Sequence, residues 1–312
     1  MIIGVGPTKC DQYQMTIGTH NGIFHPDEVL GVAILGLAHS HELFVVRTRD
    51  PEELKGLNIV IDVGGGPFDH HQKGFDARRS TGESYASAGL VWEEFGYRAV
   101  TNVLANANIS PGDYSINRVH EHIDRNIIIP VDLEDNGVCT DSHPFTFISS
   151  FNPSWLVEQD YDKAFFEAVS IASAMLENAI INATSIIVSQ DRLKEYFRFV
   201  RDGNGILEID SQTMPWLEEV VGYNKSHPFN RIKFVIFPYP AGGWAAQCVP
   251  PSIRKKFKQL VPFPKEWAGR DAKSLPELSG VIDATFCHNG RFFARAETKA
   301  GILALCHIAM GQ

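Results

Sequence analysis

Residues 58–71 read NIVIDVGGGPFDHH and combine an apolar run, a glycine turn and several side chains that bind metals. The β-branched residues 59–61 predict a buried strand that ends at Asp62. The three glycines that follow allow the backbone to turn sharply without side-chain clashes. The turn leads directly to Asp69, His70 and His71. Carboxylates and imidazoles are ligands of divalent metals, so the stretch predicts a metal site beyond the end of a strand.

The same order of features occurs earlier, in residues 15–28, MTIGTHNGIFHPDE. A short strand, a polar loop and a helix over 27–37 are expected there, with Asp27 at the start of the helix. Residues 42–47 predict a further strand, and this strand–helix–strand order predicts a parallel sheet covered by helices. Ligands bind beyond the carboxyl ends of such strands, so we expect His20 and Asp62 to share a site.

The rest of the chain predicts mostly helices and then short strands. Helices are expected at 84–95, ending at Gly96, at 116–129, at 160–187 and, after a break, at 191–201. Residues 130–137 predict an apolar segment that delivers Asp135 to a turn, and residues 140–155 predict a loop. From residue 206 on, strand candidates alternate with Pro and Gly turns before a closing helix at 298–309.

We therefore expect an α/β fold with an N-terminal parallel-sheet domain and flanking helices at 15–155. A helical linker at 156–203 and a smaller C-terminal α+β domain at 204–312 would follow.

Composition narrows the class of protein. The net charge of −9 over 312 residues argues against an extended basic surface for nucleic acid but leaves a local basic groove open. Five scattered cysteines without a CxxC pair argue against a disulfide framework or a zinc ribbon and favour a reducing compartment. No apolar run approaches the length of a membrane span, and the start lacks the pattern of a signal or transit peptide. We expect a cytoplasmic protein with no membrane partner.

The candidate metal ligands all lie at a strand end, a glycine turn or a helix start. A single histidine is more often structural than a ligand. Two His/Asp-rich turns that each follow a predicted parallel strand favour a metal site over chance. The candidates are His20, His25, Asp27, Asp62, His70, His71 and Asp135.

These motifs resemble a known superfamily and, more closely, one family. The triplet at 69–71 resembles the name-giving motif of the DHH phosphoesterase superfamily. The chain from about residue 16 to its C-terminus resembles the melanocyte-proliferating-gene (MYG) family, whose eukaryotic members are described as RNA exonucleases. The motifs that carry this second resemblance are GTHNGIFHPDE at 18–28, RTRD at 47–50, DVGG at 62–65, DHHQ at 69–72, SAGL at 87–90, DNG at 135–137, FCHNGRF at 286–292 and TKAG at 298–301.

The resemblance implies a DHH-type catalytic domain with two divalent ions, usually Mn²⁺, with Mg²⁺, Fe²⁺ and Zn²⁺ as alternatives. One ion would be held by His20, His25 and Asp62. The other would be held by Asp27, Asp62, His70 and Asp135, with Asp62 as the bridge. Two such ions activate water for an in-line attack on phosphorus. His25 stands where the superfamily usually has a carboxylate, which leaves the metal preference open.

Two further residues are expected to act in catalysis. His71 would face the phosphate, and Asp69 would orient a histidine ligand from outside the metal site.

The resemblance also implies that the second domain binds substrate through a glycine-rich motif. The candidates are His288, Gly290, Arg291, Arg295 and Lys299. For the two arginines, a solvated strand face is an equal alternative. An arginine stands at 295, near which the family usually has small residues, so the substrate contact there is open.

The expected function is a metal-dependent phosphodiesterase, most simply a 3′-to-5′ exonuclease on RNA or short oligonucleotides. One alternative is hydrolysis of a small phosphorylated molecule such as a dinucleotide or pyrophosphate. Another is a non-catalytic protein that binds metal or nucleic acid. A homodimer stays open.

Overall fold

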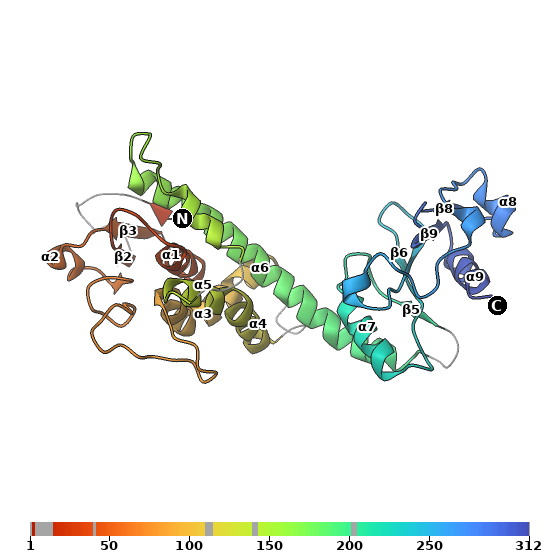
Figure 1. Ribbon diagram of the computed structural model, residues 1–312, viewed down its shortest axis with the longest axis horizontal. Helices are drawn as coiled ribbons and strands as arrows, with labels where there is room; N and C mark the ends of the chain where they lie inside the picture. The colour runs from red at the N-terminus through yellow and green to blue at the C-terminus, as the bar shows by residue number, and fades with distance from the viewer. Residues whose placement is uncertain are drawn as a thin grey trace. The chain divides into compact units, whose positions relative to one another are not determined.

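The computed structural model describes residues 2–3, 15–39, 42–109, 115–138, 143–200 and 205–311. The chain divides into two compact units, Met1–Ile187 and Val188–Gln312 (Figure 1). This boundary falls inside the segment expected to be a linker, 156–203, so the predicted three-part layout stays a prediction.

The first unit is built on a four-stranded sheet in which every pairing is parallel. The sheet order is β1-β3-β2-β4, with pairs such as Ile17↔Val45 and Gly18↔Val60. The strands are β1 (Ile2–Ile3), β2 (Met15–Thr19), β3 (Leu43–Arg47) and β4 (Ile59–Val60). The predicted parallel sheet is confirmed, although β4 is shorter than the apolar run.

Helices α1 (Pro26–Ala38) and α3 (Ser87–Asn106) pack along each other beside this sheet (Figure 1). The short α2 (Pro51–Leu54) lies between β3 and β4 in the chain. The predicted end of α3 at Gly96 is wrong, because this glycine serves close helix packing. A Cβ at Gly96 would lie 2.6 Å from the ring of Trp92 and 2.8 Å from Nε2 of His120.

The segment from 116 to 135 is continuous helix, so the apolar segment predicted over 130–137 is helical as far as Asp135, and the predicted turn follows at 136–137. It consists of α4 (Ile116–Ile123), the π-helical turn η3 (Asp124–Ile128) and α5 (Ile129–Asp135). Pro130 directly follows the π-helical turn η3, so the helix accommodates it where the regular i→i−4 hydrogen-bonding pattern is already interrupted. Asp135 therefore projects from the last turn of a helix. The region predicted as a loop contains the 3₁₀ helix η4 (Thr146–Phe151), and its residues 140–142 lie outside the described chain.

Helix α6 (Tyr161–Phe197) is one helix without the break predicted after 187, and it crosses the boundary between the units. By length and composition this helix could cross a membrane. The sequence-based expectation that no apolar segment reaches the length of a membrane span is therefore wrong. Its buried residues form a stripe at helical spacing in the core of the first unit, which is typical of a core-facing helix. This stripe is Phe165, Val169, Ala172, Leu176 and Ile180. That the protein has no membrane partner stays a prediction.

The second unit is a mixed sheet in the order β5-β6-β7-β9-β8, in which β5 and β6 are parallel and the other pairs antiparallel. Its strands are β5 (Ile206–Glu208), β6 (Phe234–Pro238), β7 (Trp244–Cys248), β8 (Ala284–Cys287) and β9 (Phe293–Ala296). Its helices are α7 (Leu217–Ser226), α8 (Leu275–Ser279) and α9 (Lys299–Ala309), with 3₁₀ turns η5 (Ile253–Lys255) and η6 (Lys265–Trp267). The chain is therefore a mixed α/β protein, as expected.

Candidate metal centre

His20 and Asp62 meet just beyond the carboxyl ends of β2 and β4. Nε2 of His20 lies 3.2 Å from Oδ2 of Asp62, and both side chains are buried. Asp62 has a φ of +60°, which a residue other than glycine adopts only at a cost. Its backbone N–H donates to the carbonyl of Phe68 at 3.0 Å and so holds it in this conformation. The sequence-based expectation that His20 and Asp62 share a site agrees with this geometry.

The glycine turn reverses the chain, so that the side chains of His70 and His71 lie next to Asp62. Oδ1 of Asp62 lies 3.4 Å from Nδ1 of His70 and 3.1 Å from Nδ1 of His71. Asp69 closes the turn, since its carboxylate accepts from the backbone N–H groups of Gly65 at 2.8 Å and His71 at 2.9 Å. One oxygen of Asp69 also lies 3.4 Å from Nδ1 of His71, which fits its expected role of orienting a histidine.

Asp27 is held by the N-terminus of α3. Its two carboxylate oxygens accept from the backbone N–H groups of Ser87 at 3.0 Å and Ala88 at 2.6 Å. The hydroxyl of Ser87 donates to Asp62 at 3.2 Å and lies 3.1 Å from Nδ1 of His70. Ser87 therefore contacts side chains from three separate motifs; the sequence placed it in the SAGL motif at 87–90 but gave it no role in the site.

Asp135 approaches the same place from α5, and its Oδ2 lies 2.9 Å from Nε2 of His70. One turn earlier on this helix, Asp132 accepts from the N–H of Gly89 at 2.9 Å and from Arg79 at 2.7 Å. Arg79 also donates to Asp124 at 2.8 Å. This buried network fixes α5 against the first turn of α3, so it sets the distance between Asp135 and Asp27.

The donor atoms fall into three groups within the described chain. In each group one donor atom from every member lies within 4.8 Å of the others. The groups are His20 with His25 and Glu28, Asp62 with His70 and His71, and Asp27 with His70 and Asp135. Every predicted ligand belongs to one of them. Glu28 was missed, since a glutamate in the first turn of a helix is ordinary in sequence.

The electrostatics of the cluster favour a bound cation. Burial raises the pKa of Asp27 well above its usual value, and the charges of Asp62, Asp135 and Asp132 add to the effect. Burial alone would lower the pKa of His20, but hydrogen bonds to Asp62 and Glu28 outweigh it and raise this pKa from 6.5 to about 10. Carboxylates crowded in this way are stabilised by positive charge between them.

The donor set also fits divalent ions in spacing and chemistry. Adjacent ligands of an octahedral ion bound at about 2.1 Å lie about 3 Å apart. The contacts of His20 with Glu28 and Asp62 are 2.9 and 3.2 Å, and that of His70 with Asp135 is 2.9 Å. Mixed imidazole and carboxylate donors suit manganese, iron or zinc.

A cleft of about 290 Å³ gives access to the cluster. It is lined by His25, Pro26, Asp27, His71, Val131, Glu134, Asp135 and Ser149. The side chain of His71 is 61% exposed, so it can reach a substrate.

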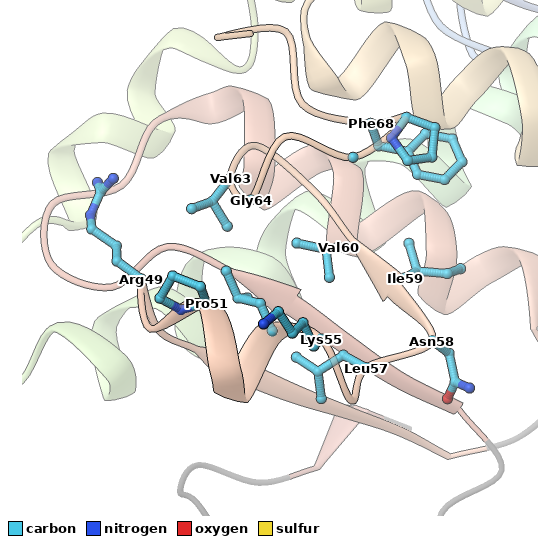
Figure 2. A pocket seen from close by; sticks show the side chains of 13 residues that line it. Arg49, Pro51, Lys55, Leu57, Asn58, Ile59, Val60, Val63, Gly64 and Phe68 are labelled. Carbon is cyan, nitrogen blue, oxygen red and sulfur yellow. The ribbon is translucent and has the colours of Figure 1, made fainter.

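A second pocket, of about 420 Å³, lies along the edge strand β4 (Figure 2). Apolar side chains such as Leu57, Val60 and Val63 line it, with Arg49 and Lys55 among the lining residues. None of its lining residues is a candidate ligand.

The predicted substrate-binding residues lie in the second unit, where several of their side chains contact neighbouring residues of that unit. His288, Gly290 and Arg291 form one tight turn, in which the Gly290 N–H donates to Nδ1 of His288 at 2.9 Å. The Arg291 guanidinium donates to the carbonyl of Phe263 at 3.2 Å.

The other two candidates of the second unit lie in the following elements, Arg295 in β9 and Lys299 at the start of α9. Arg295 donates to the carbonyl of Gly242 at 3.2 Å and stacks on the ring of Tyr239. Lys299 pairs with Glu208 at 2.5 Å. That these five residues bind substrate stays a prediction.

The family model for MYG1 exonucleases, described as uncharacterised protein family UPF0160, matches residues 16–310. The chain is 30% identical to the "MYG1 exonuclease" of Bos taurus over 326 residues, covering 95% of this chain and 84% of the relative. It is 31% identical to the "MYG1 exonuclease" of Rattus norvegicus, with the same coverage of both chains. A "MYG1 protein" of Chlamydia trachomatis serovar D is 30% identical over 297 residues, covering 91% of this chain and 92% of the relative.

Among solved structures, RecJ from Thermus thermophilus in complex with Mn²⁺ matches with 14% identity and a TM-score of 0.25. The match covers 96% of this chain and 52% of the RecJ chain, so this chain spans about half the length of that protein. A score this low carries no conclusion about the chain.

Proposed function

This chain belongs to the MYG1 family, and from that premise we propose that it is a metal-dependent nuclease that hydrolyses phosphodiester bonds in its first unit. The convergence of His20, Asp62 and His70 is the observation that carries the proposal. These side chains come from two strand ends and a glycine turn, yet they lie within contact distance beside an open cleft. Relatives of this chain bear the name exonuclease, which agrees with such a site.

We assign the first ion to His20, His25 and Asp62, and the second to Asp27, Asp62, His70 and Asp135, with Asp62 as the shared ligand. When bound, the ions would supply an activated water and charge stabilisation on the phosphate oxygens. Manganese suits the mixed donor set and is the ion we expect. With this ligand plan, we propose that the chain is a member of the DHH phosphoesterase superfamily.

The residues of the chain would position and stabilise the substrate. His71 is exposed, and its ring can donate a hydrogen bond to a non-bridging phosphate oxygen, where charge accumulates during the reaction. Asp69 holds both the backbone and the ring of His71, so it would fix the direction of that contact. Asp27, held by two backbone N–H groups, would keep its carboxylate in place without a reorganisation cost.

The finer assignment is a 3′-to-5′ exonuclease on RNA or short oligonucleotides that acts in the cytoplasm. The turn at 288–291 and the side chains of Arg295 and Lys299 would bind the substrate. The net charge of −9 favours a second candidate, a hydrolase of small phosphorylated molecules, because a long polyanion is normally bound by a basic surface.

The test is an activity panel with metal-free protein and added Mn²⁺. It compares end-labelled RNA, DNA, dinucleotides and pyrophosphate, with the wild type beside Asp62→Ala and His70→Ala. We expect both variants to lose turnover on every substrate that the wild type cleaves. Asp76→Ala is the matched control, since among the described residues this exposed aspartate pairs only with Arg78 in the same loop, and it should keep full activity.

Retained turnover in Asp62→Ala or His70→Ala would mean that the chemistry lies elsewhere. The salt dependence separates the two candidate substrate classes. A polymer substrate predicts binding that weakens steeply as salt rises, whereas a dinucleotide predicts a shallow dependence.

A further inference from the structure

We propose that Glu28 is a metal ligand and supplies a carboxylate to the ion held by His20 and His25. This inference rests on the metal centre of the proposed function. Glu28 is not among the ligands expected from the sequence for either ion. Its position follows from the start of α1, where His25 is the N-cap and Glu28 is the third residue of the helix.

One carboxylate oxygen of Glu28 has two local contacts. Oε1 accepts from the backbone N–H of His25 at 3.0 Å and lies 2.9 Å from Nε2 of His20. The first contact is an N-terminal helix cap, which fixes the carboxylate against the loop that joins His20 to His25. The second brings the carboxylate to the imidazole nitrogen that also contacts Asp62.

The other oxygen has no hydrogen-bond partner in the described chain. Glu28 is fully buried, and its Oε2 is enclosed without a donor. A buried carboxylate oxygen without a donor is unfavourable, so such an atom in a fixed position points to a missing positive partner. A divalent cation supplies this partner, since one donor atom each of His20, His25 and Glu28 lie within 4.8 Å of one another.

Charge supports the same assignment. Two neutral imidazoles give an ion no compensating negative charge, and Asp62 is shared with His70 and His71 on the other side of the cluster. Glu28 lies on the side of His20 and His25 and provides a carboxylate of its own there. The ion at this side would then have two imidazoles and two carboxylates, a set that suits manganese or iron.

Metal binding by Glu28→Gln tests the proposal without an activity measurement. The amide oxygen keeps the volume of the side chain and can still accept from the N–H of His25, so the helix cap remains. Metal-free protein is titrated with Mn²⁺ by calorimetry, and bound Mn²⁺ is examined by electron paramagnetic resonance. We expect two ions per wild-type chain with coupled spins. In Glu28→Gln we expect one ion to bind normally, the other to bind at least tenfold more weakly, and the spin coupling to be lost.

Two further variants complete the test. Glu52→Gln removes an exposed carboxylate from the first turn of another helix and should bind two ions like the wild type. Glu28→Asp keeps the negative charge at the helix N-terminus but withdraws the carboxylate by one methylene, and it should also bind one of the two ions more weakly. It replaces Glu28→Gln if circular dichroism shows that the amide variant does not fold.

Two ions bound with wild-type affinity in Glu28→Gln, or in Glu28→Asp where that variant replaces it, would overturn the assignment of Glu28 and leave the proposed function standing. A wild-type chain that binds no Mn²⁺ would overturn the proposed function itself.

Discussion

The substitution Ser87→Ala should weaken metal binding while leaving the fold intact. The hydroxyl of Ser87 is fully buried, donates to Asp62 at 3.2 Å and lies 3.1 Å from Nδ1 of His70. Because the hydroxyl donates its hydrogen to Asp62, its oxygen can accept a hydrogen bond from the Nδ1–H of His70. This leaves Nε2 of His70 free as a metal donor. Alanine removes both contacts but keeps the backbone N–H that holds Asp27.

The size of the effect follows from this geometry. Removing a hydrogen bond that orients a metal ligand typically costs 10–100-fold in metal affinity, or about 1.4–2.8 kcal/mol. The fold itself loses two hydrogen bonds of about 0.5–1.5 kcal/mol each, partly offset by about 0.5 kcal/mol because alanine favours helix more than serine. Metal affinity should therefore fall by more than tenfold in a variant whose melting temperature drops by only a few degrees.

The assay is calorimetric titration of metal-free protein with Mn²⁺, with a thermal melt of the same sample. Ser170→Ala is the control, because its exposed hydroxyl donates to the carbonyl of Phe166 within α6 and, in the part of the chain that the structure describes, to no other group. The control should bind Mn²⁺ like the wild type. A Ser87→Ala protein that binds both ions within twofold of the wild type would refute the orienting role of the hydroxyl.

Three more outcomes are expected. Gly89→Ala should destabilise the first unit by about 2–4 kcal/mol in urea unfolding, because its Cβ would lie 1.9 Å from Oδ2 of Asp132 and break a buried ion pair. Gly222→Ala, in an open helical position, should be neutral or slightly stabilising in the same assay. Arg79→Met should cost about 3–5 kcal/mol because it leaves Asp132 buried without its cation, whereas Arg78→Met should cost under about 1 kcal/mol; equal losses would contradict the buried network. Mn²⁺ at about 100 times its Kd should stabilise the chain by about 2.7 kcal/mol for each ion bound, in a thermal shift that EDTA reverses, and no shift would argue against a folded-state metal site.

The sequence was most informative where the determinants are local. The β-branched run before Asp62 and the glycines after it are sufficient to place a carboxylate at a strand end and histidines beyond a turn. The polar loop after β2 places His20 at the neighbouring strand end by the same reasoning. Parallel pairing then brings them together, since Gly18 is paired with Val60.

The features that the sequence did not predict depend on contacts from distant segments. Gly96 resembles a helix end in isolation, but it allows His120 of another helix to stack on Trp92. Pro130 resembles a helix stop, but the π-helical turn before it lets the helix continue to Asp135.

Glu28 is the clearest case in the site. A glutamate in the first turn of a helix is normally exposed, whereas Glu28 is fully buried and its Oε1 lies 2.9 Å from Nε2 of His20, which follows β2. Asp132 was missed for a related reason, because its burial depends on Arg79 from a separate loop.

The central claim is that this cluster holds divalent ions in the first unit. Its most direct test is anomalous diffraction at the manganese edge from crystals of the full chain grown with Mn²⁺. We predict two peaks, one against His20 and the other against His70 and Asp135, with Asp62 in contact with both. Well-measured data without a peak within reach of Asp62 would contradict the account.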